Sequence, residues 1–348
     1  MKRHGQLYEK VCTFENILDA YKKARRNKRY KGDVLEFTSL LEENLIDIQN
    51  QLTRRTYTPG EYKKFKVFEP KERQIMALPF PDRVVQHALN TIIEPLFDKG
   101  FIFHSYACRN GKGSHEASRR LSHWLYDLNE QHGRNVYCLK ADISKYFSSI
   151  DHRVLKGIIR TRIKCPDTLW LCDMIIDHNG GGTPGKGIPV GNLTSQLFAN
   201  IYLTELDKYM KEELKIHYYM RYMDDFLVLS DDKAYLREIL AKTENFLNNV
   251  LLLKLNPKTC IFKITQGIDF VGYRHWHTHK LIRKSSIKRI TRKIKKFTEQ
   301  YAAGEIDFDD INPCIQSWLG HIQHADTYGI RRKILSELVL QRNTKSKT

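Results

Sequence analysis

The sequence has no hydrophobic run long enough for a membrane span, and its first residues, MKRHGQLYEKVC, hold no apolar signal core. A transmembrane helix requires about 20 mostly apolar residues. There is no C-x-x-C pair either, and the seven cysteines are odd in number, which is untypical of a disulfide framework or a zinc site. We therefore expect reduced thiols, a cytoplasmic location and no membrane partner.

Acidic residues are scarce relative to basic ones. The chain of 348 residues has 40 Asp plus Glu against 58 Lys plus Arg, a net charge of +18. A surplus of this size indicates a polyanionic partner, either nucleic acid or an acidic membrane surface. Because no segment is suited to a membrane, nucleic acid is the favoured partner. The length allows two or three domains with their own cores.

One histidine-rich tract, HWHTH at 275–279, has the composition of a metal site. Alternate residues of a strand share one face, so the histidines would point the same way. No cysteine or carboxylate follows at a matching spacing, however. We therefore predict a solvated or phosphate-facing strand end at this tract.

The spacing of apolar residues predicts helices separated by short strands. Helices are expected at 34–52, 82–97, 115–129, 193–210 and 233–250, and again from about 285 to the end. Strands are expected within 54–68, 135–143 and 259–274. Two segments are very basic: 21–31 carries seven Lys or Arg, and 283–297 carries eight with isoleucines on the opposite face.

The stretch IPVGNLTSQLFANIYL, residues 188–203, places a polar cluster directly before an apolar run. Gly, Asn, Thr and Ser are ordinary residues at the start of a helix, so the cluster could serve only as a cap. It could also contribute to a substrate site. Local sequence alone leaves both interpretations open.

The segment RYMDDFLVLS has two adjacent aspartates between β-prone runs, which predicts a hairpin with Asp224 and Asp225 at its tip. Aspartates suit turns, so the pair could be purely structural. A third acid, Asp142, ends the apolar strand NVYCLKAD. If that strand lies beside the hairpin, the carboxylates converge and need cations, and Mg²⁺ prefers oxygen ligands. Two such ions, about 3.5–4 Å apart, support phosphoryl transfer.

Several segments resemble, in chain order, the motifs of reverse transcriptases. The palm motifs are matched by KADISKYFSSIDH, GIPVGNLTSQLFANIYL, YMDD and LKLNPKTCIFKITQGIDFVGY, and the fingers motifs of bacterial members by FEPKERQIMALPFPDRVVQHAL and SYACRNGKGSHEA. The resemblance implies an α+β right-hand polymerase fold. It divides the chain into an N-terminal basic helical extension (1–50), fingers (51–135 with part of 165–190), a palm of antiparallel sheet backed by helices (136–284) and a helical thumb (285–348).

The resemblance also assigns the catalytic centre. It implies that Asp142, Ile143, Asp224 and Asp225 form the site of two Mg²⁺ ions, for which Mn²⁺ is an alternative, with Asp225 as the second hairpin carboxylate. It further implies that Lys258, in LNPKT, protonates the departing pyrophosphate.

The incoming nucleotide (dNTP) has an implied site with three parts. Lys71 and Arg73 would grip its β- and γ-phosphates, although a solvated basic strand is the plainer interpretation. The backbone amides of Lys145 and Tyr146 would meet the triphosphate, and Phe147 would exclude a ribose 2′-hydroxyl unless it is only a core residue. The pocket floor would be formed by Val190, Gly191 and Gln196.

Contacts to the template RNA and the cDNA/RNA duplex are implied at scattered positions: Arg109, Lys112, Tyr222, Met223, Gly272, Tyr273, Lys293 and Lys296. Gly272 and Tyr273 would lie in the primer-grip turn, whereas Arg109 and the 110–114 loop would touch the nucleic-acid backbone.

The polar cluster narrows the resemblance. Val190 stands where ordinary bacterial reverse transcriptases have Gln, and Gln196 stands where they have Pro. This pattern resembles enzymes of diversity-generating retroelements, which copy a template-repeat RNA into cDNA with errors at adenines. It implies a bacterial or phage-encoded enzyme with a small basic accessory protein, for which segments 21–31 and 283–296 are candidate surfaces. The alternatives are a group II intron-type or retron reverse transcriptase, and a non-catalytic RNA-binding protein on the same fold.

Overall fold

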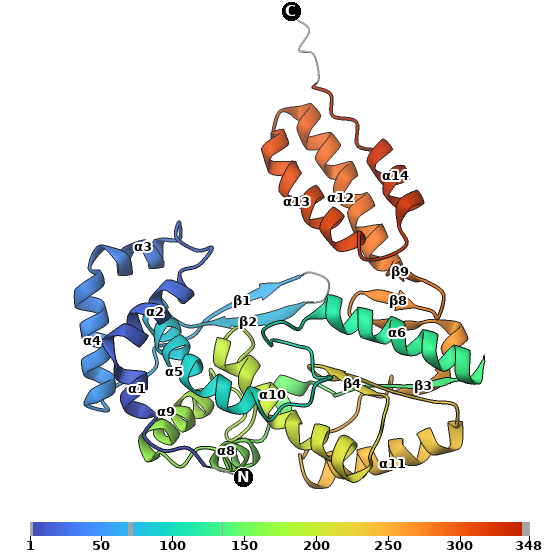
Figure 1. Ribbon diagram of the computed structural model, residues 1–348. Coiled ribbons are helices and arrows are strands. Elements are labelled where there is room, and N and C mark those ends of the chain that lie inside the picture. Colours follow the sequence, from blue (N-terminus) through green and yellow to red (C-terminus); the bar gives the residue numbers. More distant parts are fainter. Residues whose placement is uncertain (1–2, 69–71, 134, 343–348) are drawn as a thin grey trace, which may run out of the picture. The chain divides into compact units, whose positions relative to one another are not determined.

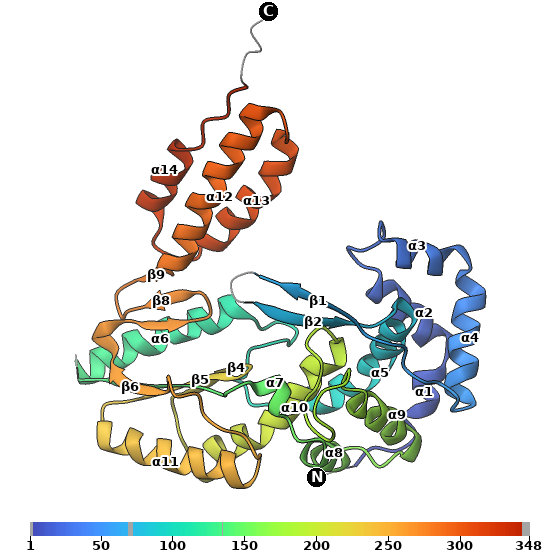
Figure 2. The ribbon, with the colours of Figure 1, turned by 180° about the vertical axis from the view of Figure 1, so that it is seen from behind.

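The computed structural model describes residues 3–68, 72–133 and 135–342, so Lys71 lies outside the described residues. Figures 1 and 2 show the helices and strands from two sides. The chain divides into two compact units. Unit 1 comprises 1–109, 140–227 and 237–259, and unit 2 comprises 110–139, 228–236 and 260–348. The boundaries proposed for extension, fingers, palm and thumb stay a prediction.

Unit 1 begins with a group of helices: α1 (Tyr8–Cys12), α2 (Phe14–Ala24), α3 (Gly32–Ser39) and α4 (Leu41–Thr53). They pack against the long helix α5 (Phe80–Asp98). The single helix predicted at 34–52 is wrong in one respect, because the chain leaves helical geometry at Leu40 (φ −123°, ψ 50°). The Asn44 side chain donates to the Phe37 carbonyl across this break, at 3.0 Å.

The predicted basic strand in unit 1 is one half of a two-stranded antiparallel ribbon. Strand β1 (Lys63–Val67) pairs with β2 (Arg73–Ala77) in a register that places Lys63 opposite Ala77. Every β1 side chain is exposed. The ribbon is followed by α5, which confirms the helix predicted at 82–97.

A four-stranded sheet has the order β4-β5-β3-β6. Its strands are β3 (Tyr137–Asp142), β4 (Tyr219–Tyr222), β5 (Asp225–Ser230) and β6 (Cys260–Lys263). The helices that connect these strands along the chain are α7 (Tyr146–Ser149), α8 (His152–Arg160), α9 (Pro166–Asp177), α10 (Leu193–Lys208) and α11 (Lys233–Asn249). The predicted helix at 193–210 is confirmed as α10, which continues into a π-helical turn, η1 (Tyr209–Glu213).

Unit 2 combines a small sheet with helices. Strands β7 (Ile268–Phe270), β8 (Tyr273–His275) and β9 (Lys280–Ile282) follow the short 3₁₀ turn η2 (Ile264–Gln266), and helix α6 (Ser114–His132) packs on β8. Helices α12 (Lys284–Ala303), α13 (Phe308–Ile322) and α14 (Tyr328–Ser336) share a core with Tyr273 and Ile282. Ile290 and Ile294 of α12 are buried there, as the sequence predicted.

The histidine tract differs from its prediction at one position. His275 is completely buried, and its Nδ1 lies 3.2 Å from the Ser122 hydroxyl of α6. Burial lowers the pKa of His275 to about 3, so this ring is neutral and is neither solvated nor phosphate-facing. Alternation on β8 explains the error, because Tyr273 and His275 both point into the core of unit 2.

Membrane-spanning length and apolarity are not found together in any helix of the described ranges. All seven cysteines lie within those ranges and are free thiols.

Candidate catalytic site

The β4–β5 hairpin carries the paired aspartates. Strand β4 ends at Tyr222 and β5 begins at Asp225, so Met223 and Asp224 form the turn and Asp225 is the first strand residue. Met223 has a positive φ of 56°, a conformation that is uncommon for a residue with a side chain. Both aspartates are half-buried. The predicted hairpin is therefore confirmed, with its tip one residue earlier than expected.

The buried side chain of Arg221 links this turn to helix α10. Its guanidinium donates to the Met223 carbonyl at 3.0 Å and forms an ion pair with Asp207 of α10, with distances of 2.8 and 2.6 Å. Both side chains of the pair are completely buried. The Tyr219 hydroxyl also donates to Asp207, at 2.7 Å. A buried pair that is satisfied in this way fixes the hairpin to the helix behind it.

A second set of contacts connects the hairpin to the segment 104–107. The Tyr106 amide donates to the Arg221 carbonyl and the Arg221 amide donates to the His104 carbonyl, at 3.0 and 2.9 Å. Asn200 of α10 donates to the Ala107 carbonyl at 2.8 Å. Arg221, Asp207 and Asn200 were not predicted from the sequence. A charged residue within the apolar strand before the aspartates was the available signal.

Asp142, the last residue of β3, is oriented by Asn256. The Asn256 side chain donates to Asp142 Oδ2 at 3.0 Å, and its backbone amide donates to the Asp142 carbonyl at 2.7 Å. Asn256 Oδ1 in turn accepts from the amide of Lys258, whose side chain is exposed. Ile143 is buried and forms a bridge with Leu255. Asn256 was missed, although it stands two residues before Lys258 in the motif LNPKT.

The segment after Asp142 turns sharply into a short helix. Lys145 adopts a left-handed conformation (φ 46°) and its side chain is exposed. Tyr146 is buried and donates to the Ala199 carbonyl at 2.5 Å. Burial raises the pKa of the Tyr146 hydroxyl well above its ordinary value, and the charge of Asp224 adds to the rise. The residues that follow Asp142 therefore lie within electrostatic reach of the hairpin.

The segment 187–191 packs between this turn and the β1–β2 ribbon. The Ile188 amide donates to the Phe147 carbonyl at 2.8 Å, and the Met76 amide of β2 donates to the Val190 carbonyl at 3.0 Å. Gly191 has a φ of +130°, and a Cβ at this position would lie only 2.6 Å from the Met76 oxygen. Only glycine permits this approach. Phe147 and Val190 are half-buried.

The polar cluster after Gly191 behaves differently from a simple helix cap. Asn192 stands at the N-cap of α10 without a side-chain capping bond, and its amide donates instead to the Tyr62 hydroxyl at 2.7 Å. Gln196 is exposed on the first turn of α10. Arg73 begins β2, and Lys71 lies outside the described residues, so their predicted contacts to the nucleotide phosphates stay a prediction.

Arg109 is placed differently from its prediction as a nucleic-acid contact. Its guanidinium pairs with Asp98 at 2.5 Å and donates to the carbonyls of Ile102 and Ser105, and the side chain is only 9% exposed. These bonds fix the loop after α5 and occupy the donors that a phosphate would need. Lys112 and Tyr222 are half-buried.

The remaining predicted contacts belong to unit 2. Gly272 lies in the β7–β8 turn with a φ of +96°, and the buried Tyr273 donates to the His321 carbonyl at 2.8 Å. Lys293 and Lys296 are exposed on α12. Gly272 and Tyr273 therefore belong to the β7–β8 turn and its edge, whereas Lys293 and Lys296 belong to an exposed basic surface of α12.

The carboxylates of Asp142 and Asp224 suit a metal site in which bound substrate supplies some of the ligands. Within the described ranges, no group of three or more His, Cys, Asp or Glu side chains is arranged to hold a metal. Mg²⁺ is usually held by one or two carboxylates together with water and substrate phosphates, not by a cage of protein ligands. The oriented carboxylate of Asp142 and the half-buried carboxylate of Asp224 fit that pattern.

Comparison with known proteins gives the class. Residues 63–275 match the family model "Reverse transcriptase (RNA-dependent DNA polymerase)", which is more than half of the chain. The chain therefore belongs to the reverse transcriptase family and is an RNA-directed DNA polymerase by class. Members of this family generally depend on a divalent metal.

Two bacterial proteins are similar to this chain in sequence. Protein YkfC of Escherichia coli (strain K12) is 29% identical over 286 residues, which cover 69% of this chain and 73% of YkfC. Group II intron-encoded protein LtrA of Lactococcus lactis subsp. cremoris is 27% identical over 180 residues, which cover 49% of this chain but 28% of LtrA.

A structure of apo telomerase from Candida tropicalis has a TM-score of 0.50 and 14% identity, covering 79% of this chain and 59% of that one. This likeness confirms the predicted α+β right-hand polymerase fold.

Proposed function

We propose that this protein is the reverse transcriptase of a diversity-generating retroelement, which copies a template RNA into cDNA with errors concentrated at adenines. Its substrates are the template RNA, the growing cDNA/RNA duplex and deoxynucleotides, and a small basic accessory protein is its partner. The observation that carries this proposal is the residue at position 190. It is valine where a hydrogen-bonding glutamine is usual, at the point where this segment meets β2.

In this proposal the backbone of the pocket floor is held in place, but the Val190 side chain offers no hydrogen bond that could orient a nucleotide. The Val190 carbonyl is committed to the Met76 amide, and Gly191 allows the two backbones to approach closely. Valine has neither a donor nor an acceptor, whereas glutamine has both. One net hydrogen bond contributes about 0.5–1.5 kcal/mol, and 1.4 kcal/mol corresponds to roughly tenfold in selection. Loss of this contact therefore favours misincorporation by several-fold.

In this proposal Asp142 and Asp224 hold the metal ions, and Asp225 adds negative charge at the hairpin. When bound, Mg²⁺ would activate the primer 3′-hydroxyl and stabilise the departing pyrophosphate. Asn256 keeps the Asp142 carboxylate in one orientation, and Arg221 keeps the turn of Asp224 in place. Phe147 excludes the ribose 2′-hydroxyl, and Lys258 protonates pyrophosphate.

The test is the error spectrum of cDNA made from an RNA with all four bases, scored separately at A, C, G and U. We expect an excess of errors at adenine in the wild type. We also expect Val190→Gln to lower that excess by about several-fold with extension retained. Val190→Leu, which changes shape without adding a hydrogen bond, is the matched control. A uniform, low error rate in the wild type would remove the retroelement assignment and leave an ordinary reverse transcriptase.

A group II intron-type enzyme is the second candidate, favoured by the 27% identity to LtrA. Such an enzyme should copy all four bases with similar fidelity and should bind its own intron RNA in preference to unrelated RNA. The same sequencing experiment therefore distinguishes the two candidates.

A further inference from the structure

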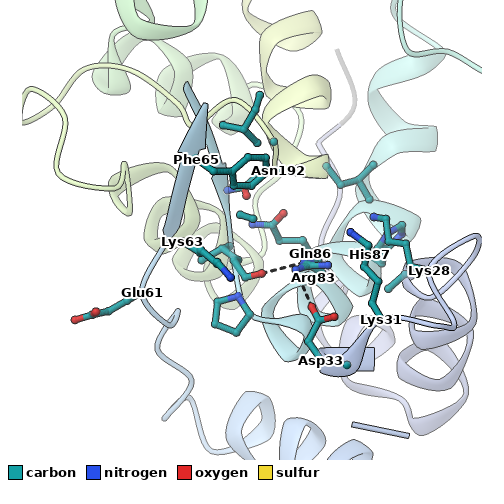
Figure 3. A pocket seen from close by; sticks show the side chains of 18 residues that line it. Lys28, Lys31, Asp33, Glu61, Lys63, Phe65, Arg83, Gln86, His87 and Asn192 are labelled. Atoms are coloured by element: carbon teal, nitrogen blue, oxygen red, sulfur yellow. Dashed lines mark hydrogen bonds and ion pairs between the residues drawn. The ribbon is translucent and has the colours of Figure 1, made fainter. Parts of the chain in front are cut away.

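A cavity of about 930 Å³ lies within unit 1, between the N-terminal helices and the exposed β1–β2 ribbon (Figure 3). Its rim includes Lys28 and Lys31 from the loop after α2 and Lys63 from β1. Gly191 and Asn192 line it at the segment already assigned to the nucleotide-pocket floor. A cavity of this volume can hold a nucleotide-sized ligand.

Positive charge is crowded around this cavity. Four cationic side chains line it, against two carboxylates: Lys28, Lys31, Lys63 and Arg83, with Asp33 and Glu61. Arg83 pairs with Asp33 at 3.0 Å. Burial lowers the pKa of Lys28, and the charges of Arg83 and Lys31 lower it further. An anionic group in the cavity would relieve this repulsion, and a phosphate is the anion that lysines commonly bind in nucleic acids.

Gln86 supplies an independent sign of a ligand. The residue lies on α5, lines the cavity and is only 2% exposed. Its Nε2 has no hydrogen-bond partner among the residues that the structure describes. A buried donor left unsatisfied costs about 1–3 kcal/mol, so a ligand with an acceptor at this point would bind favourably. Figure 3 shows Gln86 between Asn192 and Arg83.

The cavity also offers an aromatic surface. Phe65 of β1, a residue that is 45% exposed, lines it together with Ile75 and Ala77. Aromatic side chains of this kind stack on nucleobases. Asn192 is less suited to recognise a base, because its amide already donates to Tyr62. The cavity thus combines cations, a stacking ring and one buried amide donor, which together match a phosphate, a base and an acceptor on that base.

We propose that Gln86 is a specificity-determining residue, which reads the base of a single RNA-strand nucleotide held in this cavity by donating from Nε2 to an acceptor on the base edge. The proposal rests on the copying of an RNA strand by this chain. The lysines of the rim hold the adjoining phosphate, and Phe65 stacks on the base.

The experiment measures single-nucleotide extension on RNA templates with one adenine replaced by 3-deazaadenine or 7-deazaadenine, each of which lacks one ring acceptor. The replaced base is moved one position at a time through and ahead of the templating position. We expect one analogue, at one position, to slow the wild type about three- to tenfold. In Gln86→Leu, which lacks the donor, the same analogue should change the rate less than about twofold. Thr91→Val, on the same helix but outside the cavity, should keep the wild-type penalty.

An equal analogue penalty in Gln86→Leu and the wild type, or no penalty in the wild type, would overturn the proposal. Gln86→Glu keeps the side-chain shape and reverses the polarity, so it gives the same test if Gln86→Leu does not fold. Adenosine monophosphate binding, measured by calorimetry without RNA, provides the other arm. Saturable binding that needs Gln86, with no analogue penalty, would assign the cavity to a free nucleotide instead. Failure of all extension on unmodified RNA would contradict the polymerase function and not the reading of a base.

Discussion

At the scale of single residues, the hairpin carboxylate gives the most direct prediction. Asp224→Asn removes one negative charge at the half-buried turn while the basic surfaces remain. We expect primer extension to fall by roughly 100-fold or more, because charge stabilisation is the main catalytic contribution in phosphoryl transfer. RNA binding should change less than about twofold, measured on the same preparation.

Asp47→Asn, at an exposed position of α4, is the matched control for this substitution. Near wild-type extension by Asp224→Asn would refute the assignment of this residue to the metal site.

Phe147 makes a separate prediction about the sugar. Its ring is half-buried and lies 5.6 Å from the ring of Tyr146, measured between centroids. Phe147→Ala opens space beside the incoming sugar, so we expect ribonucleotide use relative to deoxynucleotide use to rise at least about tenfold. Incorporation rates at matched nucleotide concentrations provide the measurement. A constant ratio would mean that Phe147 is a core residue only.

The buried Arg221–Asp207 pair predicts a large stability effect. Asp207→Asn leaves the completely buried guanidinium without its charged partner, and such losses cost about 3–5 kcal/mol. We expect the free energy of unfolding to fall by about that amount in urea denaturation. Glu238→Gln, which breaks the exposed Lys242–Glu238 pair, should cost less than about 1 kcal/mol. Similar losses in both variants would show that the buried pair does not anchor the hairpin.

At the scale of elements, α12 separates two roles on one helix. Ile290 and Ile294 are packed in the core of unit 2, whereas Lys293, Lys295 and Lys296 are exposed. Each phosphate contact contributes about −0.7 to −0.9 to the slope of log affinity against log salt. Replacing the three lysines with alanine should therefore make the slope shallower by up to about two to three, as measured by RNA binding between low and moderate salt.

The control for α12 replaces Lys10, Lys99 and Lys164, three exposed lysines of unit 1, and removes the same total charge. If both triple variants have the wild-type slope, α12 faces solvent or a protein partner.

At the scale of the whole molecule, each unit contains a histidine whose pKa is lowered: half-buried His87 in unit 1 and completely buried His275 in unit 2. Burial lowers the pKa of His87 in unit 1 to about 4 and that of His275 in unit 2 to about 3, from an ordinary 6.5. Between these values and pH 6.5 the unfolded chain binds protons that the folded chain does not. Folded stability therefore decreases as pH falls through this window, by up to about 1.4 kcal/mol per pH unit for each histidine.

The corresponding measurement is urea unfolding at pH 6.5 and pH 5.0. We expect a loss of about 2 kcal/mol from His275 alone, and His275→Leu should remove that part of the pH dependence. His277→Leu, two residues away, is the control. An unaltered pH dependence in His275→Leu would show that another group carries the acid sensitivity.

The sequence by itself determined the reverse transcriptase class, most elements and the position of the β4–β5 hairpin. These depend on local patterns: apolar periodicity predicted α5, α6, α10 and α11 close to their observed bounds, and a short apolar run predicted β3. The order of the motifs was sufficient for the class, because residues 63–275 match the family. The surplus of basic residues likewise follows from the composition alone.

Only the tertiary structure decided which polar side chains support the site. Asn256 reaches Asp142 across 114 positions, and Arg221 reaches Ser105 across 116, so no local pattern could pair them. Arg109 was expected on nucleic acid, but the folded loop after α5 occupies its guanidinium. Burial also reversed the solvated interpretation of His275 and left Nε2 of Gln86 without a hydrogen-bond partner among the described residues. Such outcomes depend on which groups the fold brings together and shields from water, because a polar side chain in sequence carries no record of its distant neighbours.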